Sequence, residues 1–186
     1  MHEAEYPYIY RENATIYLDY LSKLIYNRYG NVKVDMLIAG GSAIILKHNF
    51  RPASEDIDSY IDSSVDISNE IYDVAVTYGI TSDWLNSDFT KSKSFSPRLL
   101  RNAEFYRNFN GILNVFVVCD LDLICMKLVS FRDKDISDLI NLFKINKWIT
   151  QQILIDRLIY LYKVANVSDI LSYNARVFVT SLKLNK

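Results

Sequence analysis

A short apolar run that ends in two glycines constrains the fold of this chain more than any other feature. Residues 34–39 are mostly apolar and have the length of a buried strand. Gly40 and Gly41 break the run, and Ser42 follows where it is expected to cap a short helix over residues 43–46. A strand that passes through a glycine turn into a helix is typical of α/β proteins.

The rest of the chain supplies further predicted strands. A second strand is expected at residues 56–61. Asn110-Gly111 lies between two segments rich in aromatic and branched residues, which predicts a tight hairpin. Residues 83–101 are polar and irregular and predict an exposed loop, within which Trp84 is interpreted as a packing anchor.

Apolar residues at spacings of three and four predict the helices. They are expected at residues 13–29, just before Gly79, and at 120–131, 136–146, 151–164 and 168–182. We therefore predict an α/β (α+β) fold: a mixed β-sheet with flanking helices and a C-terminal helical bundle. The predicted organisation is an α/β core over residues 1–119, with a helical region over residues 120–186 packed on it as one compact unit.

Composition excludes several classes of protein. Half of the 186 residues are hydrophobic, which is enough for a sizeable core. Lys and Arg number 21 against 22 Asp and Glu, so no global positive field exists to hold nucleic acid. Two Cys and two His are too few for a disulfide framework or a Cys/His zinc cluster. No apolar run approaches the roughly 18 residues of a membrane span, and the acidic start of the chain is unlike a signal peptide. We expect a cytoplasmic protein with no membrane partner.

Two aspartates on the second predicted strand are the candidates for a metal site. Residues two apart on a strand project to the same face, so Asp56 and Asp58 are expected about 6 to 7 Å apart, with Ile57 in the core. Adjacent carboxylates repel, and a divalent cation such as Mg²⁺ relieves that repulsion. The glycine turn exposes backbone N–H groups that suit a phosphate. Taken alone, the glycines also fit a plain turn, and the aspartates a solvated strand end.

The glycine turn and the aspartate pair, taken together, resemble a known superfamily. Gly40-Gly41-Ser42-Ala43, followed by Arg51-Pro52-Ala53-Ser54-Glu55-Asp56-Ile57-Asp58, resembles the DNA polymerase beta-type nucleotidyltransferases. The bacterial branch with AbiE-type toxin nucleotidyltransferases and their relatives is especially similar. The resemblance implies that Asp56 and Asp58 are catalytic residues that bind Mg²⁺ or Mn²⁺. It also implies nucleotide binding by Gly40, Gly41, Ser42, Arg51 and Ser54.

A second block, Met126-Lys127-Leu128 with Arg132-Asp133-Lys134-Asp135 and Asp138, is similar to the same branch. Lys127 has mostly apolar helical neighbours, so its ammonium needs an anion or carboxylate partner, unless the side chain extends to water. The resemblance implies that Lys127 neutralises a triphosphate, that Asp135 is catalytic and that Asp138 helps to bind the nucleotide. Helical periodicity places Asp135 and Asp138 on an ordinary solvated face.

The third carboxylate of the superfamily is not evident. The strand expected at residues 112–118 offers Asn114, and an amide cannot accept the proton of an attacking hydroxyl. Asp120 and Asp122 follow, and Asp120 is also a candidate helix N-cap. A reduced metal site, a base from another block and binding without turnover remain open.

The resemblance implies a Mg²⁺-dependent nucleotidyltransferase. Such an enzyme moves a nucleoside monophosphate from a nucleoside triphosphate to a hydroxyl of RNA, for example tRNA, or of a protein. The implied biological setting is a toxin with an antitoxin partner. The alternative is a catalytically inactive module of the same fold that binds nucleotides or proteins.

Overall fold

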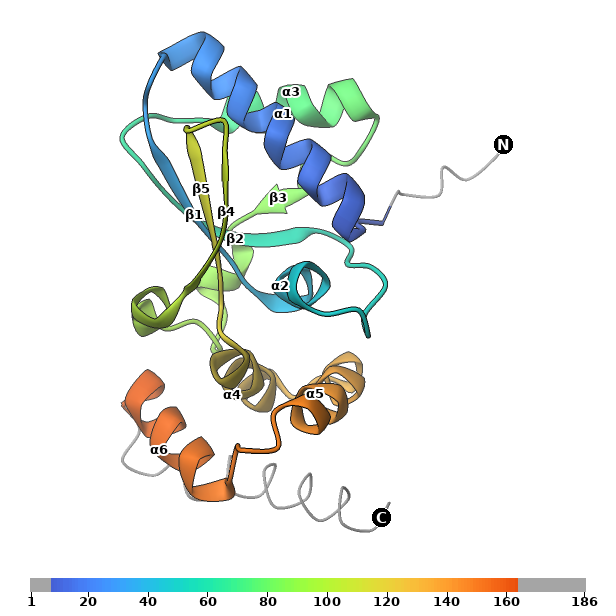
Figure 1. Ribbon diagram of the computed structural model, residues 1–186, viewed down its shortest axis with the longest axis vertical. Coiled ribbons are helices and arrows are strands. Elements are labelled where there is room, and N and C mark those ends of the chain that lie inside the picture. Colours follow the sequence, from blue (N-terminus) through green and yellow to red (C-terminus); the bar gives the residue numbers. More distant parts are fainter. Residues whose placement is uncertain (1–7, 164–186) are drawn as a thin grey trace, which may run out of the picture. The chain divides into compact units, whose positions relative to one another are not determined.

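The computed structural model describes residues 8–163, which form two compact units (Figure 1). The first unit is the chain up to Thr90 together with Ala103–Val117. The second is Lys91–Asn102 together with the chain from Val118 onward. The segment Lys91–Asn102 therefore groups with the C-terminal helices, although the β-hairpin separates it from them in the sequence.

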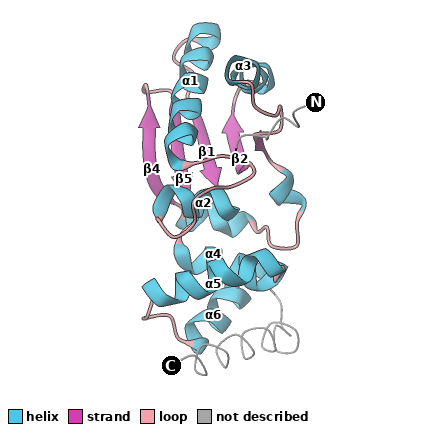
Figure 2. Cartoon of the chain, turned by 90° about the vertical axis from the view of Figure 1, so that its right-hand side faces the viewer, coloured by secondary structure: helices cyan, strands magenta, loops and turns pink. Residues whose placement is uncertain are grey.

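A mixed five-stranded sheet forms the centre of the first unit, as predicted (Figure 2). In the order β3-β2-β1-β5-β4, β1 is parallel to β5 and antiparallel to β2, β3 is parallel to β2, and β4 is antiparallel to β5. Asn110 and Gly111 both have positive φ at the turn of the β4–β5 hairpin, which confirms the predicted tight turn. The strands are β1 (Val34–Ile38), β2 (Ile57–Ser63), β3 (Leu85–Asn86), β4 (Glu104–Phe109) and β5 (Leu113–Val117).

Three helices belong to the first unit. They are α1 (Arg11–Tyr29), α2 (Gly40–Lys47) and α3 (Ser68–Tyr78), and α1 and α3 lie side by side (Figures 1 and 2). The apolar stripe of α1 is fully buried at Leu18, Leu21 and Ile25, so burial of this stripe stabilises the helix in the fold. The helix predicted at residues 13–29 is confirmed.

The second unit is helical, with α4 (Asp120–Ser130), α5 (Asp133–Ile145) and α6 (Gln151–Tyr162). The described part of this unit also contains the 3₁₀ helix η2 (Pro97–Asn102). A partly buried ion pair joins α4 to α6, because Asp122, which is fully buried, accepts hydrogen bonds from the Arg157 guanidinium. The helix predicted at residues 168–182 lies outside the described residues.

The prediction of an exposed loop at residues 83–101 is confirmed only in part, because residues 91–93 are exposed but the segment also has buried anchors. Trp84 and Leu99 are completely buried, and the Trp84 indole N–H donates to the Ile71 carbonyl at 3.0 Å. The segment contains β3, η2 and another 3₁₀ helix, η1 (Asp88–Lys91). Its apolar residues are spaced irregularly, so no periodic pattern indicates their burial. Trp84 is the packing anchor that was predicted.

No helix within residues 8–163 is both long and apolar enough to span a membrane.

Candidate active site

The glycine turn begins directly after β1. The Ala39 N–H donates to the Asp58 carbonyl at 2.9 Å, and Gly40 takes a φ of +62°, which side chains disfavour. A Cβ added to Gly40 would collide with the Asp58 carboxylate. Two constraints therefore require glycine at this position: the positive φ of the backbone and the Asp58 carboxylate that lies against it. The contact brings the glycine turn and the aspartate strand together.

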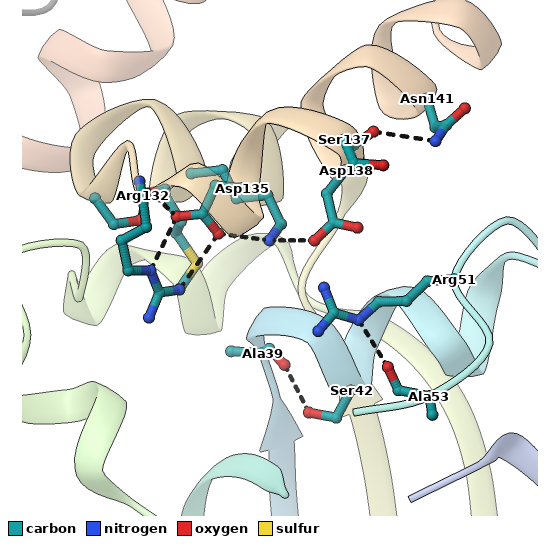
Figure 3. Close-up of polar contacts among 12 residues, drawn as sticks. Ala39, Ser42, Arg51, Ala53, Arg132, Asp135, Ser137, Asp138 and Asn141 are labelled. Carbon is teal, nitrogen blue, oxygen red and sulfur yellow. Dashed lines mark hydrogen bonds and ion pairs between the residues drawn. The ribbon is translucent and has the colours of Figure 1, made fainter. Parts of the chain in front are cut away.

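Arg51 lies against the second glycine of the turn. A Cβ on Gly41 would come within 2.8 Å of the Arg51 guanidinium, and the Arg51 Nε donates to the Ala53 carbonyl at 3.0 Å (Figure 3). The loop after α2 thus returns a guanidinium to the start of that helix. Backbone N–H groups and a cation at a helix start make an environment that suits a phosphate.

Ser42 does not cap α2. The cap is Ala39, and the helix starts at Gly40 because the positive φ there turns the chain at once. The Ser42 hydroxyl is buried and donates to the Ala39 carbonyl at 2.9 Å, so in this structure it stabilises the turn (Figure 3). Ser54 is also buried, and its backbone pairs with Ile9 in an isolated antiparallel bridge.

Asp56 and Asp58 stand at the start of β2, with Asp56 just before the strand and Ile57 buried between them. Both aspartates are partly exposed. Asn86, the β3 residue in register with Asp58, donates from its side chain to Asp56 at 2.8 Å. Asn86 is not predictable from the sequence, because the short strand β3 has no recognisable pattern.

The donors in this region fit a hard divalent cation. Asp56 and Asp58 supply carboxylate oxygens, which Mg²⁺ prefers, and the missing side chain of Gly40 lets the Asp58 carboxylate lie against the turn. Among residues 8–163 no cluster of three or more His, Cys, Asp or Glu has metal-binding geometry. A cation held by this pair would therefore complete its coordination with substrate phosphate oxygens and water, the usual arrangement for Mg²⁺.

In the second unit, Lys127 is paired with two carboxylates. Its ammonium lies 3.0 Å from Asp135 Oδ1 and 2.7 Å from Asp138 Oδ2, and all three side chains are buried (Figure 3). Of the two alternatives that the sequence leaves open for Lys127, an anionic partner or extension to water, the structure shows the first, and α5 provides the partners. The expectation that Asp135 and Asp138 lie on a solvated face is wrong, because α5 packs that face against α4.

Asp135 also fixes the start of α5. It accepts from the Arg132 backbone N–H at 3.1 Å and from the Arg132 Nε at 3.0 Å. Burial by itself raises the pKa of Asp135, but the Arg132 hydrogen bonds and the Lys127 charge outweigh burial and lower it to about 2. Asp135 is therefore ionised at neutral pH.

The candidates for a third carboxylate are engaged elsewhere. Asn114 pairs in register with Asp35 near the start of β1 and donates to it at 2.7 Å, so it lies at the other end of the strands from Gly40. The interpretation that Asn114 replaces a carboxylate at the site is wrong. Asp120 is not the N-cap of α4, which is Cys119, and it accepts from Asn146 at 2.9 Å. Asp122 is held by Arg157.

A comparison with protein families agrees with this geometry. The model of a nucleotidyltransferase family of unknown function (DUF6036) matches residues 18–181, a range that includes the glycine turn, both aspartates and the Lys127 cluster. No curated protein and no solved structure matches the chain. The match does not distinguish the toxin branch from other branches. The chain belongs to the DUF6036 nucleotidyltransferase family.

Proposed function

We propose that this protein transfers a nucleoside monophosphate from a nucleoside triphosphate to a hydroxyl group of an acceptor, with Mg²⁺ or Mn²⁺ bound by Asp56 and Asp58. The contact between Gly40 and the Asp58 carboxylate carries the proposal. It joins a turn suited to phosphate and a carboxylate pair suited to a cation. A strand end without a ligand has no need of this combination.

Each residue of the first unit has a separate task in this proposal. Gly40 and Gly41 let phosphate oxygens approach the backbone N–H groups at the start of α2. Arg51 adds positive charge beside Gly41, and Asn86 orients Asp56 by its hydrogen bond. When bound, the cation supplies positive charge that stabilises the displacement at the α-phosphorus. The chain supplies positioning and electrostatic stabilisation.

The roles of Lys127, Asp135 and Asp138 stay predictions from the resemblance. Their ion pairs hold α4 and α5 together, and this alone explains their burial. A setting as a toxin with an antitoxin partner likewise rests on the resemblance.

One observation favours the alternative of a module that binds nucleotides without turnover. β5 consists of Leu113, Asn114, Val115, Phe116 and Val117, so it carries no carboxylate that would act as a general base. The experiment below separates the two candidate functions.

Label transfer from each α-labelled nucleoside triphosphate, with Mg²⁺, to total RNA and to cellular protein tests the proposal. We expect transfer by the wild type and none by Asp56→Asn/Asp58→Asn. Asp62→Asn is the matched control, because Asp62 is an exposed residue on the same face of β2 and lies about 13 Å from Asp58. Transfer that survives the double substitution would contradict the proposal that Asp56 and Asp58 bind the catalytic cation. Mg²⁺-dependent nucleotide binding by the wild type without any transfer would favour the module that binds nucleotides without turnover.

A further inference from the structure

A small cavity beside the candidate active site is lined by two arginines and a histidine. Its volume is about 170 Å³, and Arg11, His48 and Arg51 contribute to its wall together with Glu12 and Pro52. Arg11 comes from the first turn of α1, whereas His48 and Arg51 come from the loop after α2. Three nitrogen-bearing side chains therefore meet one carboxylate in a space large enough for a phosphate group.

Arg11 is the residue that marks this cavity as a binding site. Its Nε donates to the Ile45 carbonyl at 2.8 Å, which fixes the guanidinium in place. Its Nη2 is buried and has no hydrogen-bond partner within the described residues. A buried guanidinium N–H without a partner is costly, and an anion in the cavity would provide that partner. Guanidinium groups are well suited to phosphate.

A second hollow of about 310 Å³ adjoins the first and shares Arg51 and Pro52 with it. Tyr8 and Tyr10 line it, with exposed fractions of 53% and 46%, while Ile9 between them is buried. The bridge between Ile9 and Ser54 holds this segment in place. Two exposed tyrosines beside a cationic cavity form the combination by which single-stranded nucleic acids are bound through base stacking and phosphate contacts.

The cavity shares Arg51 with the glycine turn but lies toward the other end of α2. Arg11 contacts α2 at Ile45, about 8 Å along the helix from Gly40. The far end of a helix gives no dipole attraction for an anion, so binding in this cavity would depend on the side chains. A phosphate there is therefore assigned to a group other than the triphosphate at the glycine turn.

We infer that the cavity lined by Arg11, His48 and Arg51 binds a backbone phosphate of a single-stranded nucleic acid, with flanking bases stacked on Tyr8 and Tyr10. The inference rests on the proposed function and deepens it, because it makes a nucleic acid the acceptor. In this arrangement Arg51 contacts both the glycine turn and the cavity, so the acceptor strand lies next to the nucleotide.

The test is binding of a fluorescent single-stranded RNA and of the DNA of the same sequence to the full chain, by anisotropy, without nucleotide or Mg²⁺. We expect Arg11→Gln to weaken binding about tenfold and to reduce the dependence of log K on log salt by about 0.7. Because Arg11→Gln also removes a contact with Ile45, Tyr8→Ala/Tyr10→Ala is a second variant, with an expected loss of about thirtyfold or more at unchanged salt dependence. Arg107→Gln, an exposed arginine of the same unit, is the matched control and should bind as the wild type does.

Several results would overturn the inference. They are no binding by the wild type, equal binding by the wild type and both cavity variants, and an equal loss in Arg107→Gln. Transfer of label to protein alone would assign the acceptor to another class.

An effect of Arg11→Gln on stabilisation by a nucleoside triphosphate, with RNA binding intact, would assign the cavity to the nucleotide. Binding of inorganic phosphate at high concentration, without RNA binding, would mean an adventitious ion only. Asp56→Asn/Asp58→Asn should abolish label transfer without weakening RNA binding, so failure of the catalytic proposal is distinguishable.

Discussion

The two acidic clusters of this protein are built in opposite ways. In the first unit, Asp56 and Asp58 are neighbouring like charges, both partly exposed, and the Asp58 carboxylate lies against the glycine turn. In the second unit, Asp135 and Asp138 are buried, and both contact Lys127. If the first pair binds a cation, as we propose, it gains stability from that ion, whereas the second pair already has a cation as a side chain. Carboxylates close together in a sequence can therefore be left to solvent in one region and used for helix packing in another.

Removal of the Lys127 ammonium should have the largest effect on the free energy of unfolding. Lys127→Met leaves two buried carboxylates without their shared partner, and we expect it to lower the free energy of unfolding by about 3 to 5 kcal/mol. Urea unfolding measures this loss. The control is Lys23→Met, which removes an exposed ion pair with Asp19 and should cost less than about 1 kcal/mol. Equal stability of Lys127→Met and the wild type would show that the Lys127 pairs do not stabilise the second unit.

Acid should weaken the second cluster in a defined range. The pKa of Asp135 is lowered from 3.8 to about 2 in the fold, so its contribution to stability is fully present above about pH 4 and is lost as the pH falls toward about 2. The expected loss is about 2 kcal/mol. Urea unfolding across this range should show a steeper decline for the wild type than for Asp135→Asn. Parallel declines would mean that Asp135 is not held by Arg132 and Lys127.

The contact at the glycine turn gives a smaller effect that sharpens the comparison. Gly40→Ala should cost about 1 to 2 kcal/mol from the positive φ alone, plus the displacement of the Asp58 carboxylate. Gly79→Ala is the matched control, because Gly79 has a similar φ of +64° and no atom within 4 Å of an added Cβ. We expect Gly40→Ala to be the less stable variant and to lose Mg²⁺-dependent stabilisation by nucleotide. Equal behaviour of the two variants would remove the structural link between Gly40 and Asp58.

Local patterns predicted most of the fold. The apolar run before Gly40, the stripe of α1 and the Asn110-Gly111 turn each depend on residues close in sequence, and the structure has all three. Segments whose order comes from distant contacts were not predictable. Trp84 was predicted as a packing anchor, but the burial of Phe89 and Leu99 in the same polar, irregular segment was not.

The same distinction between local patterns and distant contacts applies to the candidate site. The turn and the aspartate pair follow from spacing, and so does the need of Lys127 for a partner. Asn86 and Arg11 do not, because the contacts of Asn86 with Asp56 and of Arg11 with Ile45 join residues about 30 positions apart. The burial of Asp135 and Asp138 depends on how α5 packs on α4, and helical periodicity alone gave the opposite expectation.

The measurement that tests the central claim most directly is thermal unfolding of the wild type and Asp56→Asn/Asp58→Asn, with a nucleoside triphosphate and with or without Mg²⁺. Without Mg²⁺, the double variant should match the wild type or exceed its stability by about 1 kcal/mol, because a like-charge repulsion is removed. With Mg²⁺, the wild type should become the more stable protein, and the variant should not respond. Equal stabilisation of both proteins by Mg²⁺ and nucleotide would contradict the claim that these two carboxylates form the cation site.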